Sequence, residues 1–265
     1  MGQLNDKVAI VTGAAGKDNM AQAIARRFAS EGAKVFVTGR QEAPLKAFAE
    51  EIGGGYALMD VTKRDEVFAA VAAAKAQFGR VDIGVSATGW GLVKQFEENS
   101  EADLDRILAI QFKGPFFVFQ ALLGAMEDGG SIIQISSATA TIMLDNHSAY
   151  MGTKAGIDHV VRTIANEFGH RGIRANSISP GLTKTPMAGG AFEVPGFIEA
   201  FEREYPLGRV GTTEDIAAAA LWLASDECFM TGQNLQVNGG LTLRRNPSLI
   251  ELGDIAAKAT AHLTT

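Results

Sequence analysis

Short apolar runs rich in β-branched residues alternate along the chain with longer stretches whose apolar residues recur at helical spacing. The short runs are continuously apolar, which is typical of strands covered on both faces. The longer stretches, such as 21–32 and 65–79, end on glycine, as helices often do. The predicted strands are Val8–Thr12, Lys34–Thr38, Gly55–Met59, Val81–Ser86, Ser131–Ser136, Arg174–Ser179 and Asn234–Val237.

This alternation predicts an α/β fold with a doubly wound, seven-stranded parallel sheet, because strand–helix–strand units pair in parallel through right-handed crossovers. The sequence contains no internal repeat and no interdomain linker, so we expect one domain over residues 1–240 and a tail over 241–265. Glycines interrupt the rhythm within 187–206, which we interpret as an inserted lid. A chain of 265 residues, 46% hydrophobic and 20% charged, is large enough to bury one such core.

Charge and composition exclude several classes of function. The net charge of −6 and the pI near 5.3 argue against nucleic acid as a partner. The single cysteine, Cys228, cannot form an intramolecular disulfide, and the four histidines lack the spacing of a zinc site, so we expect no metal. The polar start MGQLNDK lacks a signal peptide's apolar stretch, and no apolar run approaches the roughly 20 residues that span a bilayer. We therefore expect a cytoplasmic protein that does not bind membranes.

The first predicted strand is followed by a glycine turn and a helix. Gly13 and Gly16 precede Asn19 and Met20, which open the helix. Glycines at such a turn let the N–H groups of a helix N-terminus approach a pyrophosphate. The spacing G-x-G-x-x-G is absent, and any strand-to-helix turn can need a glycine. The position after the first strand nevertheless favours a dinucleotide site.

The residue after the second strand bears on the choice of cofactor. Dinucleotide sites for NAD place an acidic residue there to bind the ribose 2′-hydroxyl. This chain has Gly39 and Arg40 instead. The planar fork of an arginine suits a 2′-phosphate, although a solvated surface arginine would look the same in the sequence. We therefore predict NADP, with NAD as the alternative.

Three polar residues converge on the same edge of the predicted sheet. Tyr150 and Lys154 are four residues apart at the start of a long predicted helix, so they share one helical face. Ser137 directly follows the fifth strand, at the carboxyl edge where open α/β sheets bind ligands. An isolated Tyr–Lys pair at this spacing is commonplace. Its combination with Ser137 and an upstream dinucleotide loop indicates a catalytic site.

With these residues, the chain resembles a short-chain dehydrogenase/reductase from about Lys7 to Gly240. The resemblance rests on the TG-start loop, Asp60-Val61 after the third strand, Ser137 with YMGTK thirteen residues later, SISPGLTKTPM, and TGQNLQVNGG. It implies a Rossmann fold and an enzyme that interconverts a carbonyl and a secondary alcohol with a nicotinamide cofactor.

The resemblance also implies a role for each matching residue. Tyr150 would be the general acid, Ser137 would position the substrate oxygen, and Lys154 would lower the tyrosine pKa and hold the nicotinamide ribose. Asp60 and Val61 would meet the adenine. The backbone at Gly89 would approach the cofactor, and the nicotinamide end would be met by Pro180, Gly181, Thr183 and Thr185.

Three departures from the family pattern stand out. The glycine loop resembles the longer version found in enoyl-thioester reductases, but those enzymes place tyrosine where this chain has His147. The asparagine-rich turn after the fourth strand is replaced by a segment from Ser86 to Gly89. The catalytic asparagine of the family is matched by Gln111, which keeps the amide but reaches one methylene further. Gln111 is therefore either catalytic or an ordinary helix residue.

From these features we predict an NADP(H)-dependent oxidoreductase acting on a small, largely apolar substrate. The alternatives are an enoyl-thioester reductase and a cofactor-sensing protein without catalysis. Met187, Phe192 and Phe197 are the expected substrate contacts in the lid, with Phe201 on the same helical face as Phe197, unless these rings pack at a subunit interface. A homo-oligomer, most plausibly a tetramer, is expected from the phenylalanines crowded into one helix: Phe112, Phe116, Phe117 and Phe119.

Overall fold

Seven parallel strands form one sheet in the computed structural model, which describes residues 2–185 and 188–263. Their order is β3-β2-β1-β4-β5-β6-β7, so the chain reverses direction across the sheet between β1 and β4, where α/β sheets bind ligands. This confirms the predicted sheet: β1 and β7 have the predicted ends, and the ends of the other strands differ by at most two residues. The strands are β1 (Val8–Thr12), β2 (Lys34–Gly39), β3 (Gly55–Leu58), β4 (Ile83–Ser86), β5 (Gly130–Ile135), β6 (Ile173–Pro180) and β7 (Asn234–Val237).

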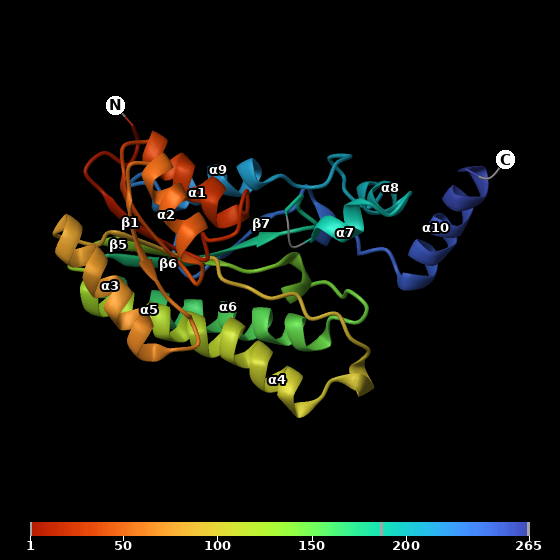
Figure 1. Ribbon diagram of the computed structural model, residues 1–265, viewed down its shortest axis with the longest axis horizontal. Helices are drawn as coiled ribbons and strands as arrows, with labels where there is room; N and C mark the ends of the chain where they lie inside the picture. Colours follow the sequence, from red (N-terminus) through yellow and green to blue (C-terminus); the bar gives the residue numbers. More distant parts are fainter. Residues whose placement is uncertain (1, 186–187, 264–265) are drawn as a thin grey trace.

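Helices cover both faces of the sheet (Figure 1). One layer holds α1 (Met20–Ser30), α2 (Glu42–Glu51) and α9 (Thr213–Ala224), and the other holds α3 (Arg64–Phe78), α5 (Gly114–Ala125) and α6 (Ser148–Phe168). Because side chains alternate along a strand, β5 supplies Ile133 and Ile135 to the first layer and Ile132 to the second. Both faces are therefore apolar, which explains the continuous apolar runs in the sequence.

A long helical stretch runs from Glu101 to Ala125 and contains a π-helical turn. It consists of α4 (Glu101–Leu108), the π-helical turn η2 (Ala109–Lys113) and α5. The stretch is long and apolar enough to cross a membrane by length and composition alone, contrary to the prediction of no such run. In the fold it is a core helix, because Phe119 and Leu122 are buried against the sheet layer. Irregular π turns often occur at functional sites.

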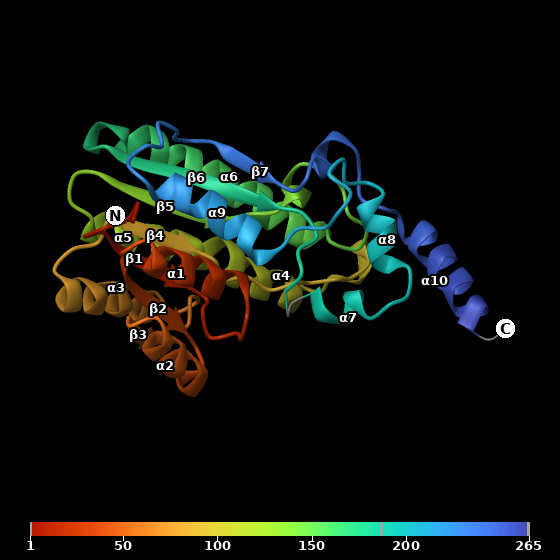
Figure 2. The ribbon, with the colours of Figure 1, turned by 90° about the horizontal axis from the view of Figure 1, so that it is seen from above.

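A third group of elements lies beyond the carboxyl ends of the strands (Figures 1 and 2). It contains α7 (Gly189–Phe192), α8 (Phe197–Glu202) and α10 (Leu249–Leu263), which projects away from the body. Four short 3₁₀ turns complete the described chain: η1 (Phe96–Glu98), η3 (Ala138–Ala140), η4 (Gly169–Arg171) and η6 (Leu241–Leu243). These elements frame the edge where the candidate site lies.

A small apolar cluster joins this third group to the sheet. Phe201 is buried with Tyr205, Leu241 and Ala138, while Phe197 packs against the cluster with its ring centroid 5.0 Å from that of Phe201. The predicted short helix is therefore present as α8, but its two rings pack onto the protein. Phe201 is buried in this cluster, where Ala138 and Leu241 come from distant parts of the sequence. The predicted contact Met187 lies outside the described residues.

The phenylalanines expected at an interface are divided between core and surface. Phe119 is buried, and Phe112 and Phe117 are partly buried against the same core cluster. Phe116 is 41% exposed, as is Leu104. One apolar strip of this helical stretch is thus left on the surface of the described chain.

Candidate active site

The glycine loop after β1 is held tightly against its neighbours. Gly13 has a φ of +85°, and a Cβ there would lie 3.2 Å from the backbone of Ala87 and Thr88. Asn19 caps α1 by accepting from the Gln22 N–H at 2.9 Å, and its Nδ2 donates to the Gly13 carbonyl at 2.8 Å. A side chain at position 13 is therefore disfavoured on both conformational and steric grounds. The loop leaves the α1 N-terminus, which begins at Met20 and has no acidic residue in its first turn, open to an anion.

The loop after β4 is tied to β1 although it lacks the family's asparagines. The Ala87 N–H donates to Thr12 Oγ1 at 3.1 Å, and the Thr88 hydroxyl lies 3.3 Å from the same oxygen. Gly89 follows, and the next residue, Trp90, stacks on the Arg106 guanidinium at 4.1 Å from the ring centroid. The hydroxyls of Thr12 and Thr88 thus hold the loop in place of the family's asparagines.

Arg40 and Asp60 lie near each other at the ends of β2 and β3. The Thr62 N–H and hydroxyl donate to Asp60 Oδ1 at 2.9 and 2.8 Å, and they lower the pKa of Asp60 together with the weaker influence of Arg40. Arg40 is exposed, while Val61 is buried against Gly114 of α5. A carboxylate, an exposed guanidinium and the backbone beside Val61 therefore meet beyond the carboxyl ends of β2 and β3.

Ser137, Tyr150 and Lys154 come together as the sequence predicted. Lys154 is 4% exposed, its Nζ donates to the Ile135 carbonyl at 2.8 Å, and it lies 5.5 Å from the centroid of the Tyr150 ring. Ser137 follows β5 and interacts with the Tyr150 hydroxyl. Its own Oγ is 2.9 Å from Thr139 Oγ1. The end of β5 and the first two turns of α6 thus bring the three side chains to one place.

Burial is the largest influence on the pKa values of Tyr150 and Lys154. It raises the pKa of Tyr150 above its usual range, and the interaction with Ser137 opposes only part of that shift. The net direction is opposite to the lowering predicted from Lys154. Burial also lowers the pKa of Lys154 to about 8, against the influence of the Asp158 carboxylate. In this arrangement the tyrosine is protonated at neutral pH, the state required of an acid.

Gln111 lies in the π-helical turn and links two parts of the site. It is 2% exposed, its Oε1 accepts from the Trp90 N–H at 3.2 Å, and its Nε2 donates to Thr153 Oγ1 at 3.1 Å. Thr153 in turn donates to the carbonyl of Tyr150 at 2.8 Å. The side-chain amide is therefore engaged with the protein on both sides, which favours a bracing role over direct chemistry.

The segment after β6 runs across the open end of the cleft. Pro180 ends the strand, and Gly181 lies so close to the Tyr205 hydroxyl that a Cβ would collide with it. Thr183 is buried, donates to the Gly181 carbonyl at 3.0 Å and pairs with Gly211 in an isolated bridge. These contacts fix the backbone that leads to Thr185.

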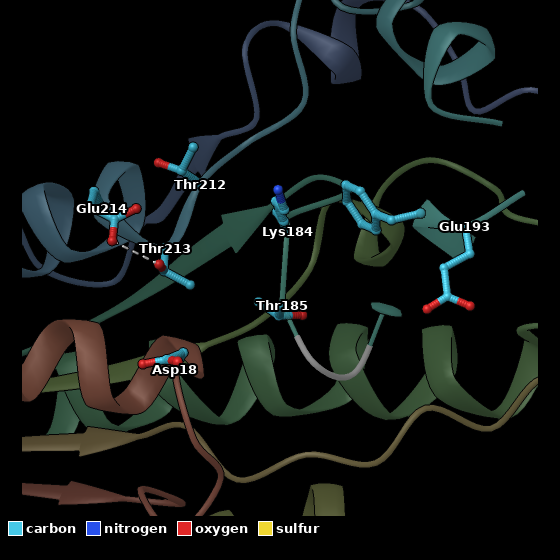
Figure 3. Close-up of a pocket in the computed structure, with 8 residues that line it drawn as sticks. Asp18, Lys184, Thr185, Glu193, Thr212, Thr213 and Glu214 are labelled. Carbon is cyan, nitrogen blue, oxygen red and sulfur yellow. Dashed lines mark hydrogen bonds between the residues drawn. The ribbon is translucent and has the colours of Figure 1, made fainter. Parts of the chain in front are cut away.

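A cavity of about 510 Å³ opens beside Thr185. It is lined by Asp18 of the glycine loop, by Lys184, and by Phe192 and Glu193 from the end of α7. The start of α9 completes it, where Thr212 accepts from the Asp215 N–H as the first residue of a capping box. Figure 3 shows these side chains around the cavity, on four separate segments of the chain.

Comparison with known proteins agrees with this geometry. Residues 13–242 match a family of proteins described as enoyl-(acyl carrier protein) reductase. The chain is 38% identical to D-threitol dehydrogenase of Mycolicibacterium smegmatis over 91% of its own length and 95% of the relative's. It is 33% identical to the NAD-dependent glycerol dehydrogenase of Listeria innocua, over 91% and 96%. A solved short-chain dehydrogenase/reductase from Mycobacterium ulcerans superposes with a TM-score of 0.88 at 30% identity, covering 93% of each chain.

The chain belongs to the short-chain dehydrogenase/reductase family. It is therefore an oxidoreductase that uses a nicotinamide cofactor and interconverts an alcohol and a carbonyl on a small molecule. Among the alternatives raised by the sequence, the sensor without catalysis is excluded.

The residues of this short-chain dehydrogenase/reductase fit a dinucleotide. Gly13 brings the backbone close, the α1 N-terminus suits a pyrophosphate, and Asp60 keeps one carboxylate oxygen, Oδ2, outside the contacts with Thr62. Asn19 shapes the loop by donating to the Gly13 carbonyl.

Sequence reasoning missed several residues of this short-chain dehydrogenase/reductase site. Asp18, Glu193 and Glu214 line the cavity, although they are far apart in the sequence. The capping pattern T-x-x-D at 212–215 was the one signal that could have located the start of α9 at the cavity. Thr153 and Asp158 contact the site from within α6, at positions that the family motif leaves open.

Proposed function

We propose that the enzyme is NADP(H)-preferring and that Tyr150, Lys154 and Ser137 carry the reaction. The observation that carries this proposal is the partly buried Tyr150 next to the buried Lys154 on one face of α6, beside Ser137 at the end of β5. In reduction, Tyr150 donates its hydroxyl proton to the developing alkoxide of the substrate. In oxidation, the tyrosine oxygen takes the same proton back. The nicotinamide, when bound, supplies or accepts the hydride.

Ser137 and Lys154 support the proton transfer in different ways. The Ser137 hydroxyl, next to that of Tyr150, holds the substrate oxygen within reach of the tyrosine proton. The Lys154 ammonium stabilises negative charge on the tyrosine oxygen, because opposite charges within a few ångströms favour the ionised form. The Lys154 ammonium has three N–H donors, and its bond to the Ile135 carbonyl uses one of them. The other two are suited to donate hydrogen bonds to the hydroxyls of a cofactor ribose.

The preference for NADP(H) rests on Arg40. It is the exposed cation beside Asp60 at the end of β2, where a 2′-phosphate would lie. Lys17, in the glycine loop, could add a second cation. The relative from Listeria innocua is named as NAD-dependent, which makes NAD(H) the alternative that affinity measurements must separate.

The substrate is proposed to be a small secondary alcohol or its ketone with a largely apolar body. Phe192 supports this, since it lines the cavity next to Thr185. A polyol is the second candidate, because two of the relatives are named for D-threitol and glycerol. The acids Asp18, Glu193 and Glu214 at the cavity are suited to accept hydrogen bonds from hydroxyl groups.

The direct test is turnover of purified protein with each cofactor. Absorbance of the reduced nicotinamide should fall with NADPH and a ketone, and rise with NADP⁺ and the corresponding alcohol. The panel should pair apolar ketones with ketoses of equal carbon number, so that polarity is the variable. Reduction of enoyl thioesters but of no ketone would overturn the proposal.

We also propose a homotetramer with paired two-fold interfaces. A first apolar face contains Leu104, Leu108 and Phe112, around a groove of about 290 Å³ between α4 and α6. A second, in the opposite layer, contains Trp222 on α9 and the fully exposed Phe229 before the edge strand β7. Two distinct self-pairing faces generate a tetramer. Light scattering should give about four times 28.0 kDa, and a monomer mass would refute the assembly.

A further inference from the structure

The buried carboxyl group of Asp158 lies one helical turn beyond Lys154 on α6. Asp158 is 7% exposed and shares a helical face with Lys154, because residues four apart in a helix are neighbours. Acids are rarely this deeply buried unless they are paired or hydrogen-bonded. Family motifs reach only as far as Lys154 in this helix, so the role of Asp158 has to come from its surroundings.

Two strands of the sheet fix this carboxyl group. Asp158 Oδ2 accepts from the Ser136 hydroxyl of β5's carboxyl end at 2.8 Å and from Asn234 Nδ2 of β7 at 2.6 Å. Asn234 is itself held, since its Oδ1 accepts from Gln236 at 3.1 Å. The Ser177 hydroxyl faces the carboxyl group from β6, but Ser177 Oγ and Asp158 Oδ1 are both left without a well-formed hydrogen bond. Burial raises the pKa of Asp158 above its usual range, and the donors on Oδ2 oppose that rise by favouring the ionised carboxylate.

The surroundings also make Asp158 the counter-charge of Lys154. The side chains that face this part of α6 from β5, β6 and β7 are neutral: Gln134, Ser136, Ser177 and Asn234. Tyr150 is the other titratable group on the same helical face. A buried ammonium without a counter-charge is strongly disfavoured, so an ionised Asp158 stabilises the charged form of Lys154. Each group favours the ionised form of the other.

We propose that Asp158 is the positioning residue for Lys154: its carboxylate, fixed by Ser136 and Asn234, keeps the Lys154 ammonium charged beside Tyr150. The inference rests on the proposed function, because it assigns Asp158 to the support of the same proton transfer. Asp158 touches neither substrate nor cofactor in this role. It acts on the reaction only through the charge of Lys154.

The test is Asp158→Asn, which keeps the size of the side chain and its acceptor oxygen but removes the charge. Loss of the carboxylate lets Lys154 lose its proton at lower pH, so the tyrosine loses its stabilising neighbour. The pH profile of alcohol oxidation should then shift upward, with its acidic midpoint about one pH unit higher. Activity at pH 7 should fall severalfold and recover as the pH is raised.

A second readout needs neither cofactor nor turnover. The chain has three tyrosines, so the ultraviolet absorbance of phenolate can be followed during a pH titration. Subtracting the titration curve of the Tyr150→Phe variant from that of the parent protein leaves the titration of Tyr150. The same subtraction between Asp158→Asn and the double variant Asp158→Asn/Tyr150→Phe gives the titration of Tyr150 in the absence of the carboxylate. The Tyr150 titration should move upward together with the activity profile. Glu167→Gln, an exposed acid on the same helix, is the control and should move neither.

Every outcome decides the question. A shift in both readouts supports the proposal, whereas a shift in neither, or in only one of them, overturns it. If Asp158→Asn does not fold, Ser136→Ala removes one donor to the carboxylate and should give a smaller shift in the same direction, and its absence overturns the proposal. Failure of the proposed function looks different: Tyr150→Phe alone would then keep its turnover, whatever Asp158 does.

Discussion

The side-chain amide of Gln111 donates to Thr153 Oγ1 at 3.1 Å, across 42 positions of sequence. This contact joins the π-helical turn to the helix that carries Tyr150, and the Trp90 N–H completes the bridge at 3.2 Å. Glutamine is one methylene longer than the asparagine of the family, and in this protein the longer side chain contacts Thr153 of the neighbouring helix α6. The substitution thus preserves an amide at this position while turning it to a structural use.

Removing this bridge should lower stability and turnover together. Gln111→Leu leaves the Trp90 N–H without its acceptor and Thr153 Oγ1 without its donor. This loss costs about 1–3 kcal/mol in the free energy of unfolding. Urea unfolding and kcat should be measured for Gln111→Leu, Thr153→Val and the double variant. The double variant should lose less than the sum of the single losses, because both remove one interaction. The matched control is Gln120→Leu, an exposed glutamine on the following helix. Additive effects would contradict the bridge.

Tyr150→Phe should lower turnover by on the order of 10² or more, which is the usual contribution of a positioned proton donor. Cofactor affinity and melting temperature should change little, since a single hydroxyl is lost. Steady-state kinetics and a fluorescence titration with NADPH measure the two effects separately. A variant that turns over at the rate of the parent protein would remove Tyr150 from the acid role.

Arg40→Asp should weaken NADPH binding and bring NADH to equal or better affinity. A charge-assisted hydrogen bond contributes about 1.5–3 kcal/mol, which corresponds to roughly ten- to a hundredfold in Kd. Calorimetric Kd values for both cofactors, with parent and variant, give the ratio directly. Lys46→Asp on α2 makes the same change in net charge at an exposed site and should leave that ratio unchanged. Stronger NADH binding by the parent protein would refute the argument from Arg40.

Asn246→Ala should loosen the loop that leads into the catalytic helix. Asn246 Nδ2 donates to the Met143 carbonyl at 2.8 Å, and the Leu249 N–H donates to Asp145 Oδ2 at 3.0 Å. Loss of the first bond should cost about 0.5–1.5 kcal/mol and raise KM more than it lowers kcat. Arg245→Ala, next in the chain, removes exposed ion pairs with Glu251 and Glu204 and a hydrogen bond to the Asn246 carbonyl, but leaves the Asn246 side chain on Met143. Exposed ion pairs contribute little to stability. Equal KM values for the two variants would show that residue 246 does not hold the loop.

Acid should weaken the cap of α9 over a defined pH range. The hydrogen bond from Arg209 lowers the pKa of Asp215 to about 2. A carboxyl whose pKa is lowered by folding contributes stability that is present above its unfolded value near 4 and is lost as the pH falls through 2. The difference in urea midpoint between the parent protein and Asp215→Asn should therefore shrink between pH 4 and pH 2. Asp226→Asn, at an exposed acid, is the control, and a constant difference for Asp215→Asn would exclude this linkage.

The sheet and the meeting of Ser137, Tyr150 and Lys154 could be predicted because both depend on local pattern. Continuous apolar runs identify buried strands, and a parallel sheet places the residue after β5 and the start of α6 at one edge. The positions of Ser137 and Tyr150 relative to these two elements are therefore enough to predict that they lie at the same edge of the sheet. Arg40 could be located on the same grounds, since it directly follows β2.

The remaining features depend on contacts that local patterns do not encode. Phe197 was predicted to contact substrate, but it packs against the cluster of Phe201 and Leu241, and the latter lies 44 positions further along the chain than Phe197. The direction of the Tyr150 pKa shift was missed for a related reason, because the burial that raises it comes from the fold as a whole. The partner of Gln111 was hidden because a π-helical turn changes which residues face α6.

The two hydrogen bonds from Asn246 and Leu249 tie the loop before Tyr150 to the part of the chain that follows β7. The loop over residues 143–145 and the described part of this tail contribute no strand to the sheet. Removal of the tail is therefore expected to free the loop before Tyr150 while leaving all seven strands paired. The tail is in this way a means of changing the loop without touching the sheet.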